Sequence, residues 1–135
     1  VVTNAFNVLE HITHMKNVEL ISTGGRYHPK TQTFTRSDSY TTLKRHNINI
    51  AFTSCISLDL KRGASEGFEE QAGFKELLVQ AAEEVILLVD SSKLNESSEY
   101  FFAKLNDITH IITDNGATPT SIDALKSHGC KVTIA

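Results

Sequence analysis

The feature that most constrains the fold is the run from Val85 to Val89, five consecutive apolar residues of which three are β-branched. Such a run, without polar alternation, is typical of a strand buried on both faces, as in parallel sheets. The segment before it carries an apolar stripe at helical spacing from Phe74 to Ala82, with charges on its other faces. A buried strand that follows an amphipathic helix predicts an α/β protein.

Strand-like and helix-like segments alternate along almost the whole chain. We expect loops over residues 26–36 and 59–67, and Gly129 at a helix C′ position. The expected strands cover residues 1–3, 18–21, 48–52, 85–89, 100–103, 109–113 and 131–134. The expected helices run from an N-cap at Asn4 to Met15, from Ser37 or Asp38 to Arg45, from about Glu70 to Ala82, and from Thr120 or Ser121 to His128. This order predicts a mostly parallel sheet with helices on both faces.

Length and composition narrow the class of protein. The 135 residues suit one domain, and the fractions of hydrophobic (40%) and charged (21%) residues are those of a soluble globular protein. The net charge is −3 and there is no polybasic run, so this segment lacks the clustered positive charge that DNA-binding and membrane-binding surfaces use. We see no signal peptide or membrane span, and we interpret Cys55 and Cys130 as reduced core residues of a cytoplasmic protein. The start at Val1-Val2, without methionine, leads us to expect further sequence upstream.

Polar residues follow each predicted strand. In parallel sheets, ligands bind beyond the carboxyl ends of the strands, so we expect these residues to converge at one edge. They are Asn4, Gly24-Gly25, residues 54–59, residues 90–93 and residues 114–116.

Lys93 is the central binding candidate, because it follows Asp90-Ser91-Ser92 at the end of the central strand. An ammonium, hydroxyls and loop amides suit a phosphate, while Asp90 can orient the lysine or accept a hydrogen bond from a sugar hydroxyl. The alternative is a solvated lysine after a serine-rich turn.

Other candidates also have ordinary structural roles open to them. Gly24-Gly25 allows close approach of a ligand, but a glycine pair also suits a turn. Asn4 suits a helix N-cap. The helix dipole alone favours the carboxylate of Glu70 at the start of a helix. His11 and His14 have a spacing used by metal sites, but no third ligand is placed with them, so we expect no metal. No nucleotide-binding or nucleophile motif is present, and we expect no cofactor.

Several segments match a known family in order and spacing: Val1-Val2-Thr3-Asn4, Gly24-Gly25, "EQAGFK" (70–75), "VILLVDSSKL" (85–94) and "DITHIITDNG" (107–116). The chain resembles the C-terminal effector-binding domain of DeoR-type transcriptional repressors over nearly all its length. The resemblance implies the fold of ribose-5-phosphate isomerase and glucosamine-6-phosphate deaminase. It also implies sensing of a phosphorylated sugar in a bacterial regulator of carbohydrate metabolism. We expect the DNA-binding winged helix-turn-helix, and the family's first strand with its phosphate-binding Asp-x-Gly-Thr-Thr loop, to lie upstream.

The sequence departs from the family pattern after the strand at 48–52. Where the family typically has Gly-Ala-Asp-Gly-Ile-Asp, this chain has Ser54-Cys55-Ile56-Ser57-Leu58-Asp59, so Ile56 replaces an acid and Asp59 is kept. In the related isomerases an acidic residue of this loop takes part in the chemistry. Proton transfer needs a positioned base, which isoleucine cannot supply, so the departure argues against catalysis.

The resemblance favours a non-enzymatic, homo-oligomeric effector domain that reaches DNA only through an upstream part and does not bind membranes. Lys93 and amides near Gly24 and Gly25 would meet the anion, and Asn4 and Glu70 the sugar hydroxyls. The complete set of expected ligand-binding residues is Asn4, Gly24, Gly25, Asp59, Glu70, Asp90, Ser92 and Lys93. Two alternatives remain: a sugar-phosphate isomerase or deaminase with Glu70 or Asp90 as its base, and a domain that mediates only dimerisation. The sugar, the sign of its effect, the oligomeric state and the operator do not follow from the sequence.

Overall fold

The computed structural model describes the backbone of all 135 residues and every side chain except those of residues 37 and 38. The predicted capping by Ser37 or Asp38 therefore lies outside the described side chains. The chain forms two compact units, Val1–Asn47 and Ile48–Ala135, which we describe one at a time.

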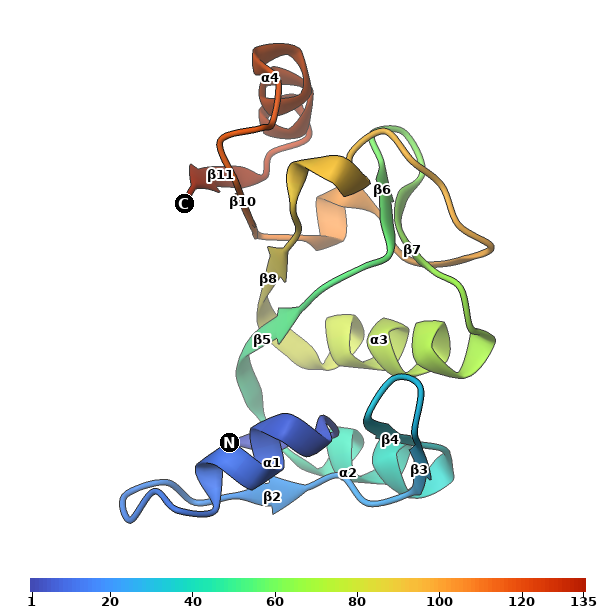
Figure 1. Cartoon of the computed structure of the whole chain (residues 1–135), viewed down its shortest axis with the longest axis vertical. Coiled ribbons are helices and arrows are strands. Elements are labelled where there is room, and N and C mark those ends of the chain that lie inside the picture. The colour runs from blue at the N-terminus through green and yellow to red at the C-terminus, as the bar shows by residue number, and fades with distance from the viewer. The chain divides into compact units, whose positions relative to one another are not determined.

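The first unit contains two small sheets and two helices. Strands β1 and β2 pair in parallel, and β3 and β4 form an antiparallel hairpin. Its elements are β1 (Val2–Thr3), α1 (Phe6–Ile12), β2 (Ile21–Ser22), β3 (Arg26–His28), β4 (Thr33–Thr35) and α2 (Ser37–Arg45) (Figure 1).

Helix α1 begins later and ends earlier than predicted. Its N-cap is Ala5, while Asn4 uses its side-chain amide to donate to the Phe34 carbonyl at 3.1 Å. The helix ends before Thr13, whose hydroxyl donates to the Glu10 carbonyl at 2.8 Å and competes with continuation of the helix. Beyond it, the side chain of Met15 is 45% exposed, so a further helical turn would gain little stabilisation from burial of this side chain.

The segment 26–36, predicted as a loop, contains the β3–β4 hairpin. Tyr27 pairs with Phe34 across the two strands, with ring centroids 5.3 Å apart, and cross-strand aromatic pairs stabilise hairpins. The predicted strand at 18–21 is likewise shifted, because pairing with β1 occurs only at Ile21 and Ser22.

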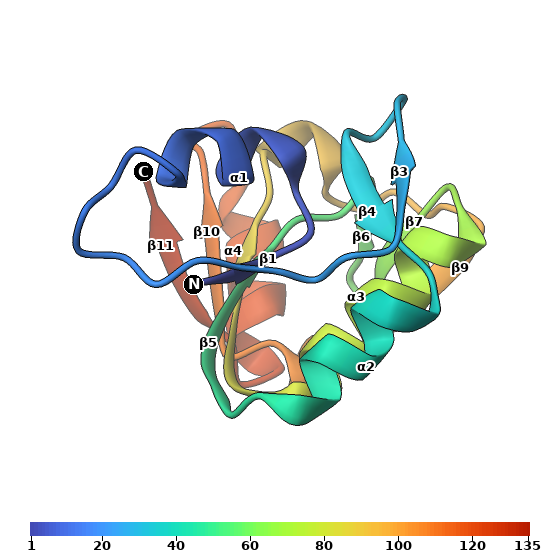
Figure 2. The same cartoon turned by 90° about the horizontal axis from the view of Figure 1, so that it is seen from below.

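The second unit is built on a parallel sheet with the strand order β11-β10-β8-β5. Figure 2 shows β5, β10 and β11 running along one another. A second sheet, β6-β7-β9, is antiparallel. The elements are β5 (Ile48–Thr53), β6 (Ser57–Asp59), β7 (Gly63–Glu66), α3 (Glu69–Ala81), β8 (Ala82–Leu88), η1 (Ser91–Lys93), β9 (Tyr100–Ala103), η2 (Leu105–Asp107), β10 (His110–Thr113), α4 (Pro119–Ser127) and β11 (Lys131–Ile134). The predicted α/β fold, with a parallel sheet flanked by helices, is confirmed.

Two local predictions in this unit are wrong. The predicted loop at 59–67 contains most of the β6–β7 hairpin, whose turn is closed by the Asp59 carboxylate accepting from the N–H groups of Lys61 and Arg62. Helix α4 begins at Pro119, because Thr118 is the N-cap and accepts from the Ser121 N–H at 3.2 Å. Proline is well suited to the first helical position, where its missing N–H costs nothing.

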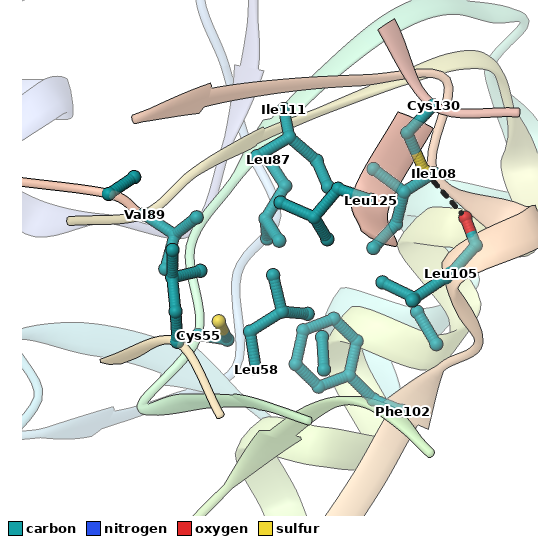
Figure 3. Packing of buried hydrophobic residues seen from close by; sticks show 14 of the residues in the cluster. Cys55, Leu58, Leu87, Val89, Phe102, Leu105, Ile108, Ile111, Leu125 and Cys130 are labelled. Carbon is teal, nitrogen blue, oxygen red and sulfur yellow. Dashed lines mark hydrogen bonds between the residues drawn. The ribbon is translucent and has the colours of Figure 1, made fainter. Parts of the chain in front are cut away.

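The core of the second unit joins the parallel sheet to both of its helices and to the antiparallel sheet. Leu87 and Ile111 are fully buried at its centre, next to Leu125 of α4 and Leu58 of β6 (Figure 3). Both cysteines belong to this cluster as free thiols, and the thiol of Cys130 donates to the Leu105 carbonyl at 3.2 Å. None of the helices that the structure describes is long and apolar enough to cross a membrane.

Candidate functional site

The carboxyl ends of β5, β8 and β10 lie next to one another in the second unit. Leu87 pairs with Thr53, and the N–H of Val89 donates to the Ile112 carbonyl at 3.0 Å. The residues that follow these strands, Ser54, Asp90 and Asp114, therefore leave the sheet at the same edge. This is the edge at which parallel sheets bind ligands.

Asp114 joins the ends of β10 and β8. Its carboxylate accepts from the N–H of Ser91 at 2.6 Å, from the Ser91 hydroxyl at 2.8 Å and from the N–H of Gly116 at 2.7 Å. These hydrogen bonds, led by that from the Ser91 N–H, lower the pKa of Asp114. A Cβ at Gly116 would lie 2.5 Å from the Ser91 hydroxyl oxygen, so the contact needs glycine there. The structure thus brings residues 90–93 and 114–116 together, as predicted.

Asp90, Ser92 and Lys93 form the exposed part of this edge, within and before η1. Asp90 accepts from both the N–H and the hydroxyl of Ser92, and its other oxygen lies 3.4 Å from Lys93 Nζ. The hydrogen bond from Ser92, and then the nearby Lys93, lower the pKa of Asp90. The Lys93 side chain is 36% exposed, so its ammonium is oriented by Asp90 and still reaches solvent.

The main-chain amides of this turn are occupied within the protein. Those of Ser91 and Ser92 donate to Asp114 and Asp90, and those of Lys93 and Leu94 donate to the carbonyls of Asp90 and Ser91. An anion at this turn would therefore be met by the Lys93 ammonium and the Ser92 hydroxyl, rather than by the loop amides that the sequence also suggested.

A buried ion pair lies at the end of β5. Lys75 of α3 pairs with Glu66 of β7 and donates to the Ser54 carbonyl at 2.7 Å. Their side chains are only 16% and 7% exposed. Lys75 therefore links α3 and β7 to Ser54, the residue that follows β5.

Cys55 lies among these charged groups. Burial raises the pKa of its thiol to about 11, against the opposing effect of the charges of Lys75 and Lys93. Glu66 and Asp90 also act on this thiol electrostatically. The ion pair and the Asp90–Lys93 pair therefore belong to one neighbourhood around the end of β5.

Residues 1–115 match the family model described as the DeoR C terminal sensor domain. The chain belongs to this family of sensor domains.

Curated relatives are transcriptional regulators. The HTH-type transcriptional regulator YulB of Bacillus subtilis is 32% identical over 98% of this chain and 52% of its own length. The L-fucose operon activator of Haemophilus influenzae is 34% identical over 84% of this chain and 46% of its own length. The HTH-type transcriptional repressor GlcR of Bacillus subtilis is 26% identical over 99% of this chain and 52% of its own length. This sensor domain thus spans about half the length of these relatives, and the family and relatives are named as regulators, not enzymes.

Three predicted contacts of the sensor domain lie in its first unit. Asn4 and Gly24 follow the paired strands β1 and β2. The Gly24 carbonyl accepts from the Ser39 hydroxyl at 2.7 Å, and its N–H donates to the Ser22 hydroxyl at 3.3 Å. Gly25 has a φ of +103°, and a Cβ there would lie 2.3 Å from the Thr35 carbonyl oxygen. The close approach that requires Gly25 is thus made by the protein's own backbone.

Two further predicted contacts, Asp59 and Glu70, lie in the second unit. Asp59 accepts from the Ser97 hydroxyl at 2.9 Å besides closing the β6–β7 turn, and its pKa is lowered, first by the Arg62 N–H. Glu70 lies in the first turn of α3, where the helix dipole favours a carboxylate. Both residues have structural roles, and their contact with a ligand stays a prediction.

After β5, Ile56 and Ser57 replace the Asp-Gly of the family pattern, and the two residues lie in different environments. Ile56 is 47% exposed, and Ser57 is buried in β6. An exposed isoleucine therefore stands where the family pattern has an acid. Among the described residues, no group of three His, Cys, Asp or Glu side chains is placed to hold a metal ion.

The sequence placed Ser91 and Asp114 at this edge but not among the expected ligand-binding residues, and it did not select Glu66 at all. Asp114 carries a usable signal, because it directly follows a predicted strand that neighbours β8. Glu66 carries none, since it falls in a segment predicted as a loop and its partner Lys75 is nine residues away in another element.

Proposed function

We propose that this sensor domain, residues 1–135, is an effector-binding unit that recognises a phosphorylated sugar and thereby controls DNA binding by another part of the protein. The observation that carries the proposal is the exposed ammonium of Lys93, held at the edge where β5, β8 and β10 end. The names of relatives support a sugar-linked role, since one is an operon activator for L-fucose.

The groups at this edge suit both halves of a sugar phosphate. Lys93 offers a cation that Asp90 orients, and the Ser92 hydroxyl adds a polar contact for the phosphate. The carboxylates of Asp90 and Asp114 are ionised at neutral pH, because hydrogen bonds lower the pKa of each. Such carboxylates accept hydrogen bonds from sugar hydroxyls. The assignment of Asn4, Gly24, Gly25, Asp59 and Glu70 to the same ligand stays a prediction from the sequence.

Effector binding would act by shifting a population rather than by chemistry. A ligand that binds one arrangement of a homo-oligomer better than another changes the balance between them by its difference in affinity. In the proposal, that balance sets the spacing of the attached DNA-binding parts.

The test is a thermal-shift screen of the complete protein with a panel of sugar phosphates. A ligand present at about 100 times its Kd stabilises the folded state by roughly 2.7 kcal/mol, which raises the melting temperature by several degrees. We expect Lys93→Ala to lose most of this stabilisation, and the control Lys126→Ala, at an exposed lysine of α4, to keep it. Equal stabilisation of Lys93→Ala and the wild type would show that the site is misplaced.

A further inference from the structure

A cavity of about 460 Å³ lies in the second unit, at the β6–β7 turn. The described residues that line it include basic side chains from three places in the chain: the turn, η2 with its preceding residue, and the end of α4. The basic residues are Lys61, Arg62, Lys104 and His128, and Phe101, Leu105 and Asn106 complete the described lining. No acidic side chain is among its described lining residues. The cavity is therefore a concentration of positive charge on a chain whose net charge is −3.

This basic cavity is separate from the edge that carries Lys93. Neighbouring residues of a strand point to opposite faces, and Phe102 is buried in the core while Phe101 lines the cavity. Lys104 and Asn106 precede β10, whereas Asp114 follows it, so the two places lie at opposite ends of that strand. A four-residue strand separates them by roughly 13 Å.

The cavity wall is fixed by contacts within the protein. The Arg62 guanidinium carbon lies 3.9 Å from the centre of the Phe101 ring, and the backbone of Lys61 and Arg62 is held by Asp59. Gly63 packs so closely on β9 that a Cβ would lie 2.0 Å from the Ala103 carbonyl oxygen. The turn that carries two of the cations is thus locked against the strand that leads to Lys104.

The two acids of these turns are already engaged. Asp59 accepts from the turn amides, and Asp107 accepts from the Lys104 N–H at 2.9 Å. At the end of α4, the N–H groups of His128 and Gly129 donate to the carbonyls of Leu125 and Lys126. The negative end of that helix is therefore partly satisfied. Asp59 interacts electrostatically with Arg62, but neither Asp59 nor Asp107 lines the cavity, whose lining carries the cationic side chains of Lys61, Arg62 and Lys104.

From this arrangement we infer a second ligand site, for a nucleoside phosphate. The ammonium groups of Lys61 and Lys104 would pair with the phosphates. The stacked Phe101 and Arg62 offer a flat surface for a base, and the Asn106 amide supplies both a donor and an acceptor for a base edge. The volume lies in the range of small-molecule sites, about 300–1,000 Å³.

Isothermal titration calorimetry of the complete protein with ADP, adenosine and pyrophosphate tests this site. We expect ADP to bind more tightly than either fragment, because only ADP engages both the cations and the stacked pair. Lys104→Glu should weaken ADP binding at least tenfold. Lys61→Glu, in the exposed turn, should weaken it as well and serves as a second variant if Lys104→Glu is poorly folded by circular dichroism.

Two matched variants distinguish binding in this cavity from binding elsewhere on the protein. Lys126→Glu makes the same charge change on α4 outside the cavity, and Lys93→Ala alters only the other site; both should bind ADP within twofold of the wild type. Absence of ADP binding at millimolar concentration would overturn the inference. So would equal weakening by Lys126→Glu, loss of binding in Lys93→Ala alone, or pyrophosphate binding as tightly as ADP.

Discussion

Replacement of Lys75 by methionine tests the buried ion pair that joins α3 to β7. Methionine keeps much of the aliphatic length of lysine beside the Phe102 ring, whose centre lies 5.5 Å from Lys75 Nζ. The substitution removes only the ammonium that pairs with Glu66 and donates to the Ser54 carbonyl. The expected result is a substantial loss of stability, because a carboxylate is left buried without its partner.

The magnitude follows from the burial of the pair. Exposed ion pairs contribute about 0–1 kcal/mol, whereas removal of one partner of a buried pair costs about 3–5 kcal/mol. Glu66 is 7% exposed and Lys75 is 16% exposed, so some water reaches the lysine and we expect a cost of about 2–4 kcal/mol. Ser54 is exposed, so water replaces the donor to its carbonyl. For a cooperative unit of 135 residues, 3 kcal/mol corresponds to a fall in melting temperature of roughly 10 °C.

Urea denaturation followed by far-UV circular dichroism measures this loss, since the chain has no tryptophan to report fluorescence. In the Lys75→Met background, Glu66→Gln removes the stranded charge and should restore about 1–2 kcal/mol. The control Lys126→Met, at an exposed lysine, should stay within about 0.5 kcal/mol of the wild type. A Lys75→Met variant as stable as this control, or a double variant less stable than Lys75→Met, would show that the buried charge does not set the loss.

The packing and the Cys55 thiol give three further predictions. Leu87→Ala should destabilise the protein by about 2–4 kcal/mol in urea titrations, because this side chain is fully buried, whereas Leu88→Ala, at a side chain 44% exposed, should cost well under half as much. Gly25→Ala should cost more than Gly129→Ala in the same assay: both have positive φ, but a Cβ meets the Thr35 carbonyl oxygen at 2.3 Å in the first and nothing within 4 Å in the second. Cys55 should react with iodoacetamide at pH 8 only after unfolding, because its pKa is raised to about 11. Since the unfolded thiol ionises first, near pH 9.0, the urea midpoint should fall as pH rises from about 9 towards 11, and by less in Cys55→Ala.

The sequence predicts those helices and strands whose pattern of apolar residues can be recognised within the element itself. The apolar run at β8 and the stripe of α3 need no partner to be recognised, and both are present. The predicted burial of this run on both faces is wrong, because Val85 and Leu87 are buried whereas Leu88 is 44% exposed. The hairpins β3–β4 and β6–β7 were predicted as loops. Their strands are only three or four residues long and are separated by turns that contain Pro29 or residues 60–62, so no alternation of apolar and polar residues is long enough to be recognised. Their strands are specified by pairing across the turn.

The same distinction applies to the candidate site. Asp90 and Lys93 are three residues apart, so their proximity is a local property of the turn. The contact of Ser91 with Asp114 spans 23 residues, and follows from the sequence only once the order of the parallel strands is known. The contact of Glu66 with Lys75 depends on how β7 packs against α3, which no local pattern records.

Contact between Lys93 and the effector phosphate is tested by removing the phosphate from the ligand and the ammonium from the protein in one set of titrations. A sugar phosphate found in the screen, and the same sugar without its phosphate, are titrated calorimetrically into the wild type and Lys93→Met. If Lys93 meets the phosphate, Lys93→Met weakens binding of the sugar phosphate about tenfold or more, and leaves binding of the plain sugar unchanged, because a charge-assisted hydrogen bond is worth about 1.5–3 kcal/mol. Equal weakening for both ligands, or for neither, would show that Lys93 does not recognise the phosphate.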